Sequence, residues 1–221
     1  MEWFNELPDD VATVYHNIFR RRDVRREFSG EVIDRDMLMR VLEAAHAAPS
    51  VGLTQPWDFH IVQDPARLAE FAQHVGQCRD DFAAKLDGER KDTFNPIRIE
   101  GIEAAGTGIV VTYDPTRGGT NILGRDTIAD TGLMSVALAI QNLWLAATAE
   151  GIGMGWVSFY KEEFLADFIG VEAPVRPVGW LCLGPVTHLA KERDLEAFGW
   201  RKGLPLDAVV HWDIADSVAN D

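Results

Sequence analysis

The sequence predicts a single layered α+β domain that spans residues 1–221. The chain has 221 residues and is 47% hydrophobic, which is enough for one sizeable core. Helical and strand patterns intermix along the chain, and this order is typical of a layered α+β domain. Neither an internal repeat nor a low-complexity linker interrupts it, so we expect no domain boundary.

The first third of the chain predicts two helices and a strand. A proline and two aspartates open an apolar run that predicts a helix over 9–22. Asp34 is placed to cap a second helix, which ends near Pro49 because a proline cannot continue it. The alternation of residues over 57–62 then predicts a strand.

The middle of the chain predicts a long helical region over 66–104, broken at Pro96. Its centre is strongly polar, and we expect a mobile lid over 84–98. An apolar run then predicts a buried strand over 108–113, and the glycine-rich stretch 116–124 predicts a loop.

The most apolar helix is predicted over 131–150. Because its apolar residues cover more than one face, it should lie at the domain centre or in a subunit interface. A turn over 151–155 should lead into a strand over 156–160. A short helix over 162–169 with Gly170 behind it and a strand over 178–184 follow. A C-terminal arm over 190–213 contains apolar residues, so we expect the arm to dock on the rest of the protein.

Composition excludes several classes of function. A net charge of −14 disfavours nucleic-acid binding, which depends on neutralising phosphates. No uninterrupted apolar run approaches a membrane span, and the N-terminus lacks a secretory signal, so we expect a cytoplasmic protein. The six histidines are scattered, and neither Cys78 nor Cys182 has a partner at metal-ligand spacing; no metal site is predicted. Cys182 should be a core residue. P-loop, Rossmann and serine-hydrolase motifs are absent.

Five arginines lie within the seven residues from Arg20 to Arg26. The planar guanidinium group donates two parallel hydrogen bonds to a phosphate, so a phosphate grip is one interpretation. The other is a solvated charge run at a helix end. Asp23 is unusual in an anion site, because its charge would repel the ligand unless it acts on another part of it.

Three further segments could contribute to a site. The loop 48–57 contains Ser50 and Gln55, which could present a hydroxyl and an amide to a flat heterocycle, although it could also be an ordinary turn. Alternate glycines before Trp156 would allow the backbone to approach a planar ligand closely. Arg201 is part of a cationic pair in the tail, which could equally be surface charge.

Together these segments resemble the nitroreductase-like flavoprotein family, over roughly residues 14–206. The residues that carry the resemblance are Arg21-Arg22-Asp23-Val24-Arg25, Ala48-Pro49-Ser50-Val51-Gly52, Gln55-Pro56-Trp57, Gly155-Trp156-Val157-Ser158 and Gly199-Trp200-Arg201. The resemblance implies a central, mostly antiparallel sheet flanked by helices. It also implies a homodimer with FMN at the interface.

Two positions favour an unusual subgroup of this family. Ordinary nitroreductases carry serine where this chain has Asp23 and asparagine where it has Leu53, whereas Asp23 and Ser158 match the members that destroy their flavin. The resemblance thus implies an oxidoreductase that uses O2 to fragment reduced FMN into 5,6-dimethylbenzimidazole and erythrose 4-phosphate, for the lower ligand of cobalamin. FMN would be the substrate, and a separate flavin reductase would supply its reduced form from NAD(P)H.

The resemblance implies a role for each site residue. The residues expected to contact FMN are Arg21, Arg22, Asp23, Val24, Arg25, Ser50, Gln55, Gly155, Trp156 and Arg201. Arg21, Arg25 and Arg201 would hold the phosphate, Asp23 would act as general base and stay ionised beside the arginines, and Ser158 would orient oxygen or relay a proton. Two alternatives remain open at this point: an FMN-dependent NAD(P)H nitroreductase or quinone reductase, and a flavin carrier without turnover.

Overall fold

A computed structural model describes residues 3–212 of the chain. Three short 3₁₀ helices complement eight α-helices and four strands in this part of the chain. In chain order the elements are η1 (Trp3–Glu6), α1 (Asp9–Arg20), α2 (Arg35–His46), η2 (Val51–Leu53), β1 (Trp57–Val62), α3 (Pro65–Ala83), α4 (Gly88–Phe94), α5 (Ile102–Ala105), β2 (Thr107–Tyr113), α6 (Thr131–Ala149), β3 (Ile152–Val157), α7 (Glu162–Ile169), β4 (Arg176–Pro185), α8 (Asp194–Ala197) and η3 (Leu206–Ala208).

The four strands form one antiparallel sheet in the order β1-β2-β4-β3. β2 is buried at every position, as a central strand covered on both faces must be. Because successive side chains of a strand point to opposite faces, Ile109 and Val111 pack on one side of the sheet and Val110 on the other.

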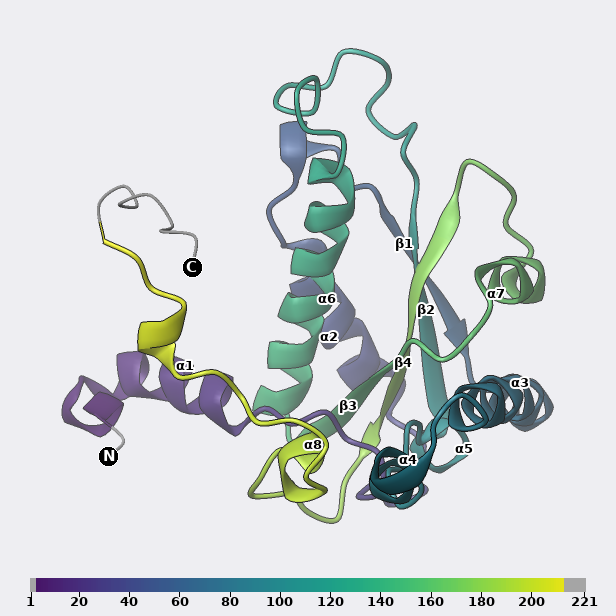
Figure 1. Cartoon of the computed structure of the whole chain (residues 1–221). Coiled ribbons are helices and arrows are strands. Elements are labelled where there is room, and N and C mark those ends of the chain that lie inside the picture. The colour runs from purple at the N-terminus through teal and green to yellow at the C-terminus, as the bar shows by residue number, and fades with distance from the viewer. Residues whose placement is uncertain (1–2, 213–221) are drawn as a thin grey trace, which may run out of the picture.

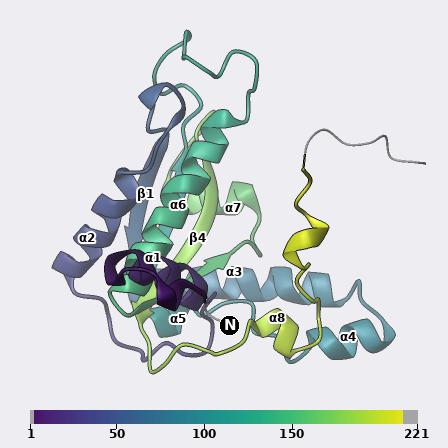
Figure 2. The same ribbon diagram turned by 90° about the vertical axis from the view of Figure 1, so that its left-hand side faces the viewer.

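Helices cover both faces of the sheet, as Figure 1 shows. α2 and α6 pack on one face, and α3, α5 and α7 pack on the other. Figure 2 shows the same arrangement from the side, with α6 in front of the strands. The α+β prediction of a sheet between helices is therefore confirmed. Cys182 is fully buried in the second layer, as expected, and burial raises the pKa of its thiol to about 12.

Most predicted elements lie close to their expected positions. The Asp34 carboxylate accepts hydrogen bonds from the amides of Asp36 and Met37, both at 3.1 Å, and so caps α2 as predicted. α7 has the predicted bounds and ends at Gly170, whose φ of 70° is left-handed. α1 ends two residues earlier than predicted, because Arg21 is extended and starts the segment that runs beside the sheet.

Two predicted elements were wrong in detail. The helical region over 66–104 breaks at Pro96 as predicted, since residues 95–101 form no helix, but it breaks a second time between α3 and α4 and so consists of three helices. Pro96, which lacks the amide proton that a helix needs, lies in the gap over 95–101. The turn predicted over 151–155 is instead most of strand β3, which pairs with β4 and ends at Val157.

α6 is long and apolar enough to cross a membrane by length and composition alone, but half of its most apolar window is buried inside the structure. It packs against α2, β2 and β3 as the core helix of one layer. Met134 and Leu138, one turn apart, remain exposed. The predicted place of α6 at the domain centre is therefore confirmed for most of its surface, and the predicted subunit interface stays a prediction for the exposed part.

Apolar side chains are also exposed on α1 and on the C-terminal segment. No residue of α1 is buried, although Val14, Ile18 and Phe19 are apolar. Leu204, Leu206 and the residues after them are exposed, whereas Trp200 packs on Phe82 and Phe94, so the predicted docking of the arm holds only for its first half within one chain. Figure 1 shows α1 and this arm standing off the same side of the sheet. The last residue of the predicted arm, 213, lies outside the described residues.

Candidate functional site

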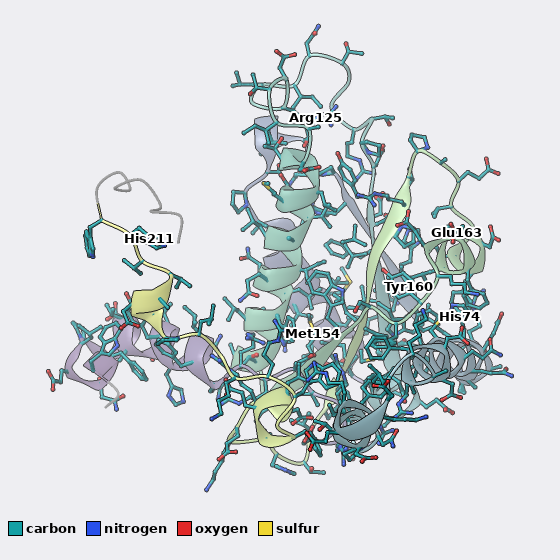
Figure 3. All side chains as sticks on the ribbon, viewed as in Figure 1. His74, Arg125, Met154, Tyr160, Glu163 and His211 are labelled. Atoms are coloured by element: carbon teal, nitrogen blue, oxygen red, sulfur yellow. The ribbon has the colours of Figure 1, made fainter. Side chains whose placement is uncertain are left out.

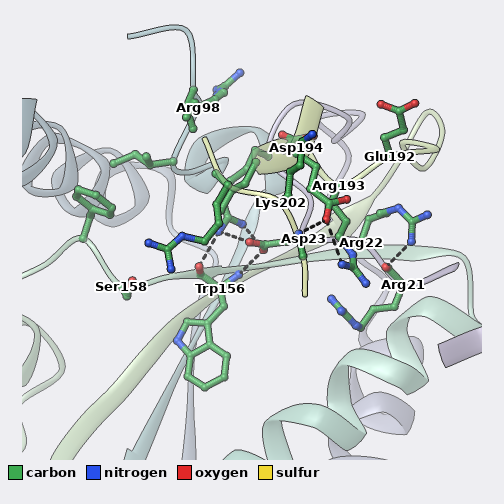
Figure 4. A pocket seen from close by; sticks show the side chains of 18 residues that line it. Arg21, Arg22, Asp23, Arg98, Trp156, Ser158, Glu192, Arg193, Asp194 and Lys202 are labelled. Atoms are coloured by element: carbon green, nitrogen blue, oxygen red, sulfur yellow. Dashed lines mark hydrogen bonds and ion pairs between the residues drawn. The ribbon is translucent and has the colours of Figure 1, made fainter. Parts of the chain in front are cut away.

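A cavity of about 510 Å³ lies where the arginine segment, the end of β3 and α8 meet. This volume falls within the range of small-molecule sites. Figure 4 shows this cavity with Asp23 near its centre. Of the residues named as candidates from the sequence, the cavity contains Arg21, Arg22, Asp23, Arg25, Trp156, Ser158 and Arg201. Residues from three distant parts of the chain therefore meet, as the sequence predicts.

The arginine segment reaches the cavity by running beside the edge strand β3. Asp23 forms a parallel bridge with Met154, and the Val24 amide donates to the Met154 carbonyl oxygen at 2.9 Å. The side chain of Val24 is buried in the core, so it anchors the segment and does not face the cavity. The backbone therefore fixes the direction in which Asp23 points.

The alternate glycines of β3 make this close pairing possible. A Cβ at Gly155 would lie under 3.0 Å from the Arg25 guanidinium and from the Val24 carbonyl oxygen, and one at Gly153 would be equally close to Val186. These glycines therefore admit the chain's own arginine segment. Their expected contact with a planar ligand stays a prediction.

Gly155→Ala should consequently destabilise the fold by about 1–3 kcal/mol, because the new methyl group forces the arginine segment off β3. Gly76→Ala is the matched control: its Cβ would meet nothing within 4 Å on helix α3. That change should instead stabilise the protein by about 0.5–1 kcal/mol. Thermal unfolding midpoints measure both, and a Gly155→Ala midpoint at or above that of Gly76→Ala would contradict the packing described here.

Asp23 is held by three hydrogen bonds. Arg25 donates to its two carboxylate oxygens, at 2.6 and 2.8 Å, and the Trp156 amide donates to Oδ1 at 3.1 Å. About half of the Asp23 side chain (49%) is accessible, and it lines the cavity. Loss of hydration raises the pKa of Asp23 above its usual 3.8, while Arg25, the Trp156 amide and Arg21 oppose the rise.

The sequence analysis expected the arginines to keep Asp23 ionised, and Arg25 and Arg21 do favour its ionised form. Desolvation is the largest effect, and it makes the carboxylate a stronger base than an ordinary aspartate. The indole of Trp156 packs against Gly179, away from the carboxylate, so Trp156 serves the site through its main chain.

The arginines of the segment have different tasks. Arg25 is 8% exposed and also donates to the carbonyl oxygens of Val24 and Trp156, so its guanidinium is fully engaged. Arg22 donates to three main-chain carbonyl oxygens. Within residues 3–212, the guanidinium of Arg21 stacks on Trp144, 4.6 Å from the ring centroid, and has no hydrogen-bond or ion-pair partner. Arg21 is therefore the member of this group that can receive an anion.

Other cavity residues come from the C-terminal part of the chain. Ser158 follows β3 and is exposed to the cavity, as are Arg201 and Lys202. Asp194, at the start of α8, is a second carboxyl group there, and burial raises its pKa. The sequence analysis missed it, because an aspartate in a segment of mixed charge carries no motif.

Ser50 and Gln55 do not reach this cavity within one chain. Their loop is bonded to the first turns of α6, where the Val51 amide donates to Ser135 Oγ at 3.1 Å. The arginine segment contacts the far end of α6, where Trp144 Nε1 donates to the Arg22 carbonyl oxygen. Ser135 and Trp144 are nine residues apart on α6, and at the rise of an α-helix this corresponds to about 14 Å.

The Ser50 loop is nevertheless ordered by its own bonds. Ser50 Oγ accepts from the Gln55 amide at 3.0 Å, and Arg117 donates to the Gln55 carbonyl oxygen. Gln55 has a φ of 45°, a conformation that side chains other than glycine rarely adopt. Such strain persists where surrounding structure enforces it and is frequent at functional positions.

Buried polar groups elsewhere have structural roles. His74 accepts a hydrogen bond from the Lys161 amide at 3.0 Å and stacks on Phe164, and burial lowers its pKa. Figure 3 shows it on the α3 side of the sheet near Tyr160. Within residues 3–212, no three His, Cys, Asp or Glu side chains are grouped as metal ligands.

Comparison with known proteins identifies the family of this chain and agrees with its fold. The model of the nitroreductase family matches residues 18–185. The chain is 35% identical to 5,6-dimethylbenzimidazole synthase of Rhodospirillum rubrum over 84% of this chain and 87% of that protein. It is 32% identical to the enzyme of the same name from Rhodobacter capsulatus, over 85% of this chain and 90% of that protein.

Solved structures show the same fold at lower identity. An iodotyrosine deiodinase bound to FMN and 3-iodo-L-tyrosine superposes with a TM-score of 0.72 at 19% identity, covering 91% of this chain and all of that one. The NADPH:FMN oxidoreductase of Vibrio harveyi superposes with a TM-score of 0.66 at 19% identity, covering 93% of this chain and 79% of that one. The chain therefore belongs to the nitroreductase family, in the branch that contains the 5,6-dimethylbenzimidazole synthases.

Proposed function

We propose that this protein is a 5,6-dimethylbenzimidazole synthase, which uses O2 to fragment reduced FMN into 5,6-dimethylbenzimidazole and erythrose 4-phosphate. The observation that carries this proposal is the Asp23 carboxylate, fixed by Arg25 and the Trp156 amide in a cavity that also contains Ser158. The two relatives with that activity in their names support it. FMN supplies the electrons for oxygen and the atoms of both products.

The phosphate of FMN would be held by Arg21 and Arg201, with Lys202 beside them. These side chains face the cavity, and none of them makes a side-chain hydrogen bond or ion pair within the described chain. Arg25 was expected to share this task, but its guanidinium is already bonded to Asp23 and to two carbonyl oxygens. We assign Arg25 the task of orienting Asp23.

Asp23 would act as the general base for the proton transfers that carbon–carbon cleavage requires. Its two oxygens are fixed by donors, so the direction of proton transfer is set before the substrate arrives. Ser158 lies at the same cavity with an exposed hydroxyl, where it could relay a proton or orient oxygen.

The pH dependence should report Asp23. The ionised carboxylate is the base, so product formation falls as the pH drops through the pKa of Asp23. Because that pKa is raised above 3.8, the decline should begin at a higher pH than for an ordinary aspartate. Rates of product formation against pH, with FMN saturating, measure it. An activity that stays flat down to pH 4 in a folded protein would contradict this role.

The ring end of FMN requires a second copy of the chain. Ser50 and Gln55 are displaced from the cavity along α6, so the expected contacts cannot form within one protomer. The exposed apolar residues of α1, of α6 and of the C-terminal arm would be covered in a homodimer. Light scattering should give twice the 24.6 kDa mass of one chain.

A direct test mixes the purified protein with chemically reduced FMN and then admits air. Mass spectrometry should show 5,6-dimethylbenzimidazole and erythrose 4-phosphate, with a matching loss of FMN. Quantitative return of oxidised FMN without fragments would overturn the proposal. NADPH consumption with a nitroaromatic would then identify a reductase. A separate flavin reductase is the expected source of reduced FMN in the cell.

A further inference from the structure

Arg90 of α4 makes two contacts with Trp200 of the C-terminal segment, one to its ring and one to its main chain. Its guanidinium carbon lies 3.2 Å from the centroid of the Trp200 ring, and its Nη1 donates to the Trp200 carbonyl oxygen at 3.0 Å. One contact holds the side chain and the other holds the main chain. These contacts fix both the indole and the peptide group that leads to Arg201.

Trp200 is also seated on an aromatic cluster behind the cavity. Its ring lies 6.5 Å from Phe82 and 5.9 Å from Phe94, and Phe82 contacts Phe159 at 5.5 Å. Phe159 follows Ser158 and lines the cavity. The cluster therefore joins α3, α4 and the end of β3 to the segment that carries Arg201.

A second hydrogen bond fixes the segment at Gly203, three residues after Trp200. Glu196 Oε1 accepts a hydrogen bond from the Gly203 amide at 2.7 Å. Arg201 and Lys202 lie between this bond and Trp200, and both are exposed, with no side-chain hydrogen bond or ion pair to any described residue. Their approach to the cavity thus depends on the two main-chain anchors beside them.

We propose that Arg90 is a positioning residue for the anion site: it fixes Trp200, and Trp200 sets where Arg201 enters the cavity. This inference rests on the proposed function, because the anion is the phosphate of FMN. A long arginine side chain loses conformational freedom when it binds a ligand. Fixing its backbone in advance lowers that loss and so tightens binding.

The test titrates FMN in its oxidised form and measures the dissociation constant by flavin fluorescence. Arg90→Ala should weaken FMN binding by about five- to tenfold. This is the size expected when a charged contact is lost that positions a ligand-binding residue without touching the ligand. Lys91→Ala is the control, because it removes the same charge from the next, exposed position of α4. It should leave the affinity within about twofold of wild type.

A double-mutant cycle then separates an indirect role from a direct one. If Arg90 acts through Arg201, the Arg90→Ala/Arg201→Ala protein binds FMN no more weakly than Arg201→Ala alone. The inference is overturned if the increases in the FMN dissociation constant caused by Arg90→Ala and Arg201→Ala multiply in the double variant. It is also overturned if Lys91→Ala weakens FMN binding as much as Arg90→Ala does, or if Arg90→Ala binds FMN as tightly as a wild type that binds it. A wild type that binds no FMN would overturn the proposed function and this inference with it. Melting curves confirm that each variant is folded.

Discussion

Asp23→Asn should lower the formation of 5,6-dimethylbenzimidazole by at least about a hundredfold, the usual effect of losing a general base. The asparagine amide cannot accept a proton from the substrate at neutral pH. It can keep one oxygen for the Trp156 amide, which now donates to Asp23 Oδ1 at 3.1 Å. FMN affinity should change only a few fold, because Arg21 and Arg201 are untouched.

Asp81→Asn supplies the control, since it removes an exposed carboxylate on α3, outside the cavity. Rapid mixing of reduced FMN with oxygen gives the rate, and fluorescence titration gives the affinity. Equal loss of rate and affinity in Asp23→Asn would indicate that Arg25, now lacking its full ion pair, had shifted. An unchanged rate would show that Asp23 is not the base.

The sequence predicted those parts of the fold that local signals specify. Asp34 before an apolar helical pattern fixed the start of α2, and Gly170 fixed the end of α7. β3 was placed too late, because its glycines resemble a turn when read alone. Only the pairing with β4 on one side and with the arginine segment on the other makes a glycine-rich strand stable.

The sequence predicted several of the residues that line the site but not the role of each arginine in it. Five clustered arginines suggested one anion grip, yet the structure commits Arg25 to Asp23 and Arg22 to carbonyl oxygens. Asp23 is only two positions from Arg25, but the main chain of Trp156, 131 positions from Arg25, holds both side chains. Arg22 bonds to Lys191, 169 positions away. No local pattern reports such distant contacts. Arg90 was missed for the same reason, because Trp200 lies 110 residues further along the chain.

A heterodimer carrying Asp23→Asn in one chain and Ser50→Ala/Gln55→Ala in the other should recover activity that neither homodimer has. If each site takes Asp23 from one chain and the Ser50 loop from the other, one of the two sites is intact. The isolated heterodimer should then have about half of the wild-type activity per dimer. Two different affinity tags, used in sequence, purify it from co-expressing cells.

The reversed arrangement makes the test decisive. Placing all three substitutions in one chain, beside a wild-type partner, damages both sites if they are shared and only one if each chain has its own. The shared site therefore predicts near-zero activity for this heterodimer, whereas a site within one chain predicts about half. The distance between the Val51 and Arg22 anchors on α6 favours the shared site. Because the two arrangements contain the same substitutions, a difference between them can arise only from which chain contributes the loop.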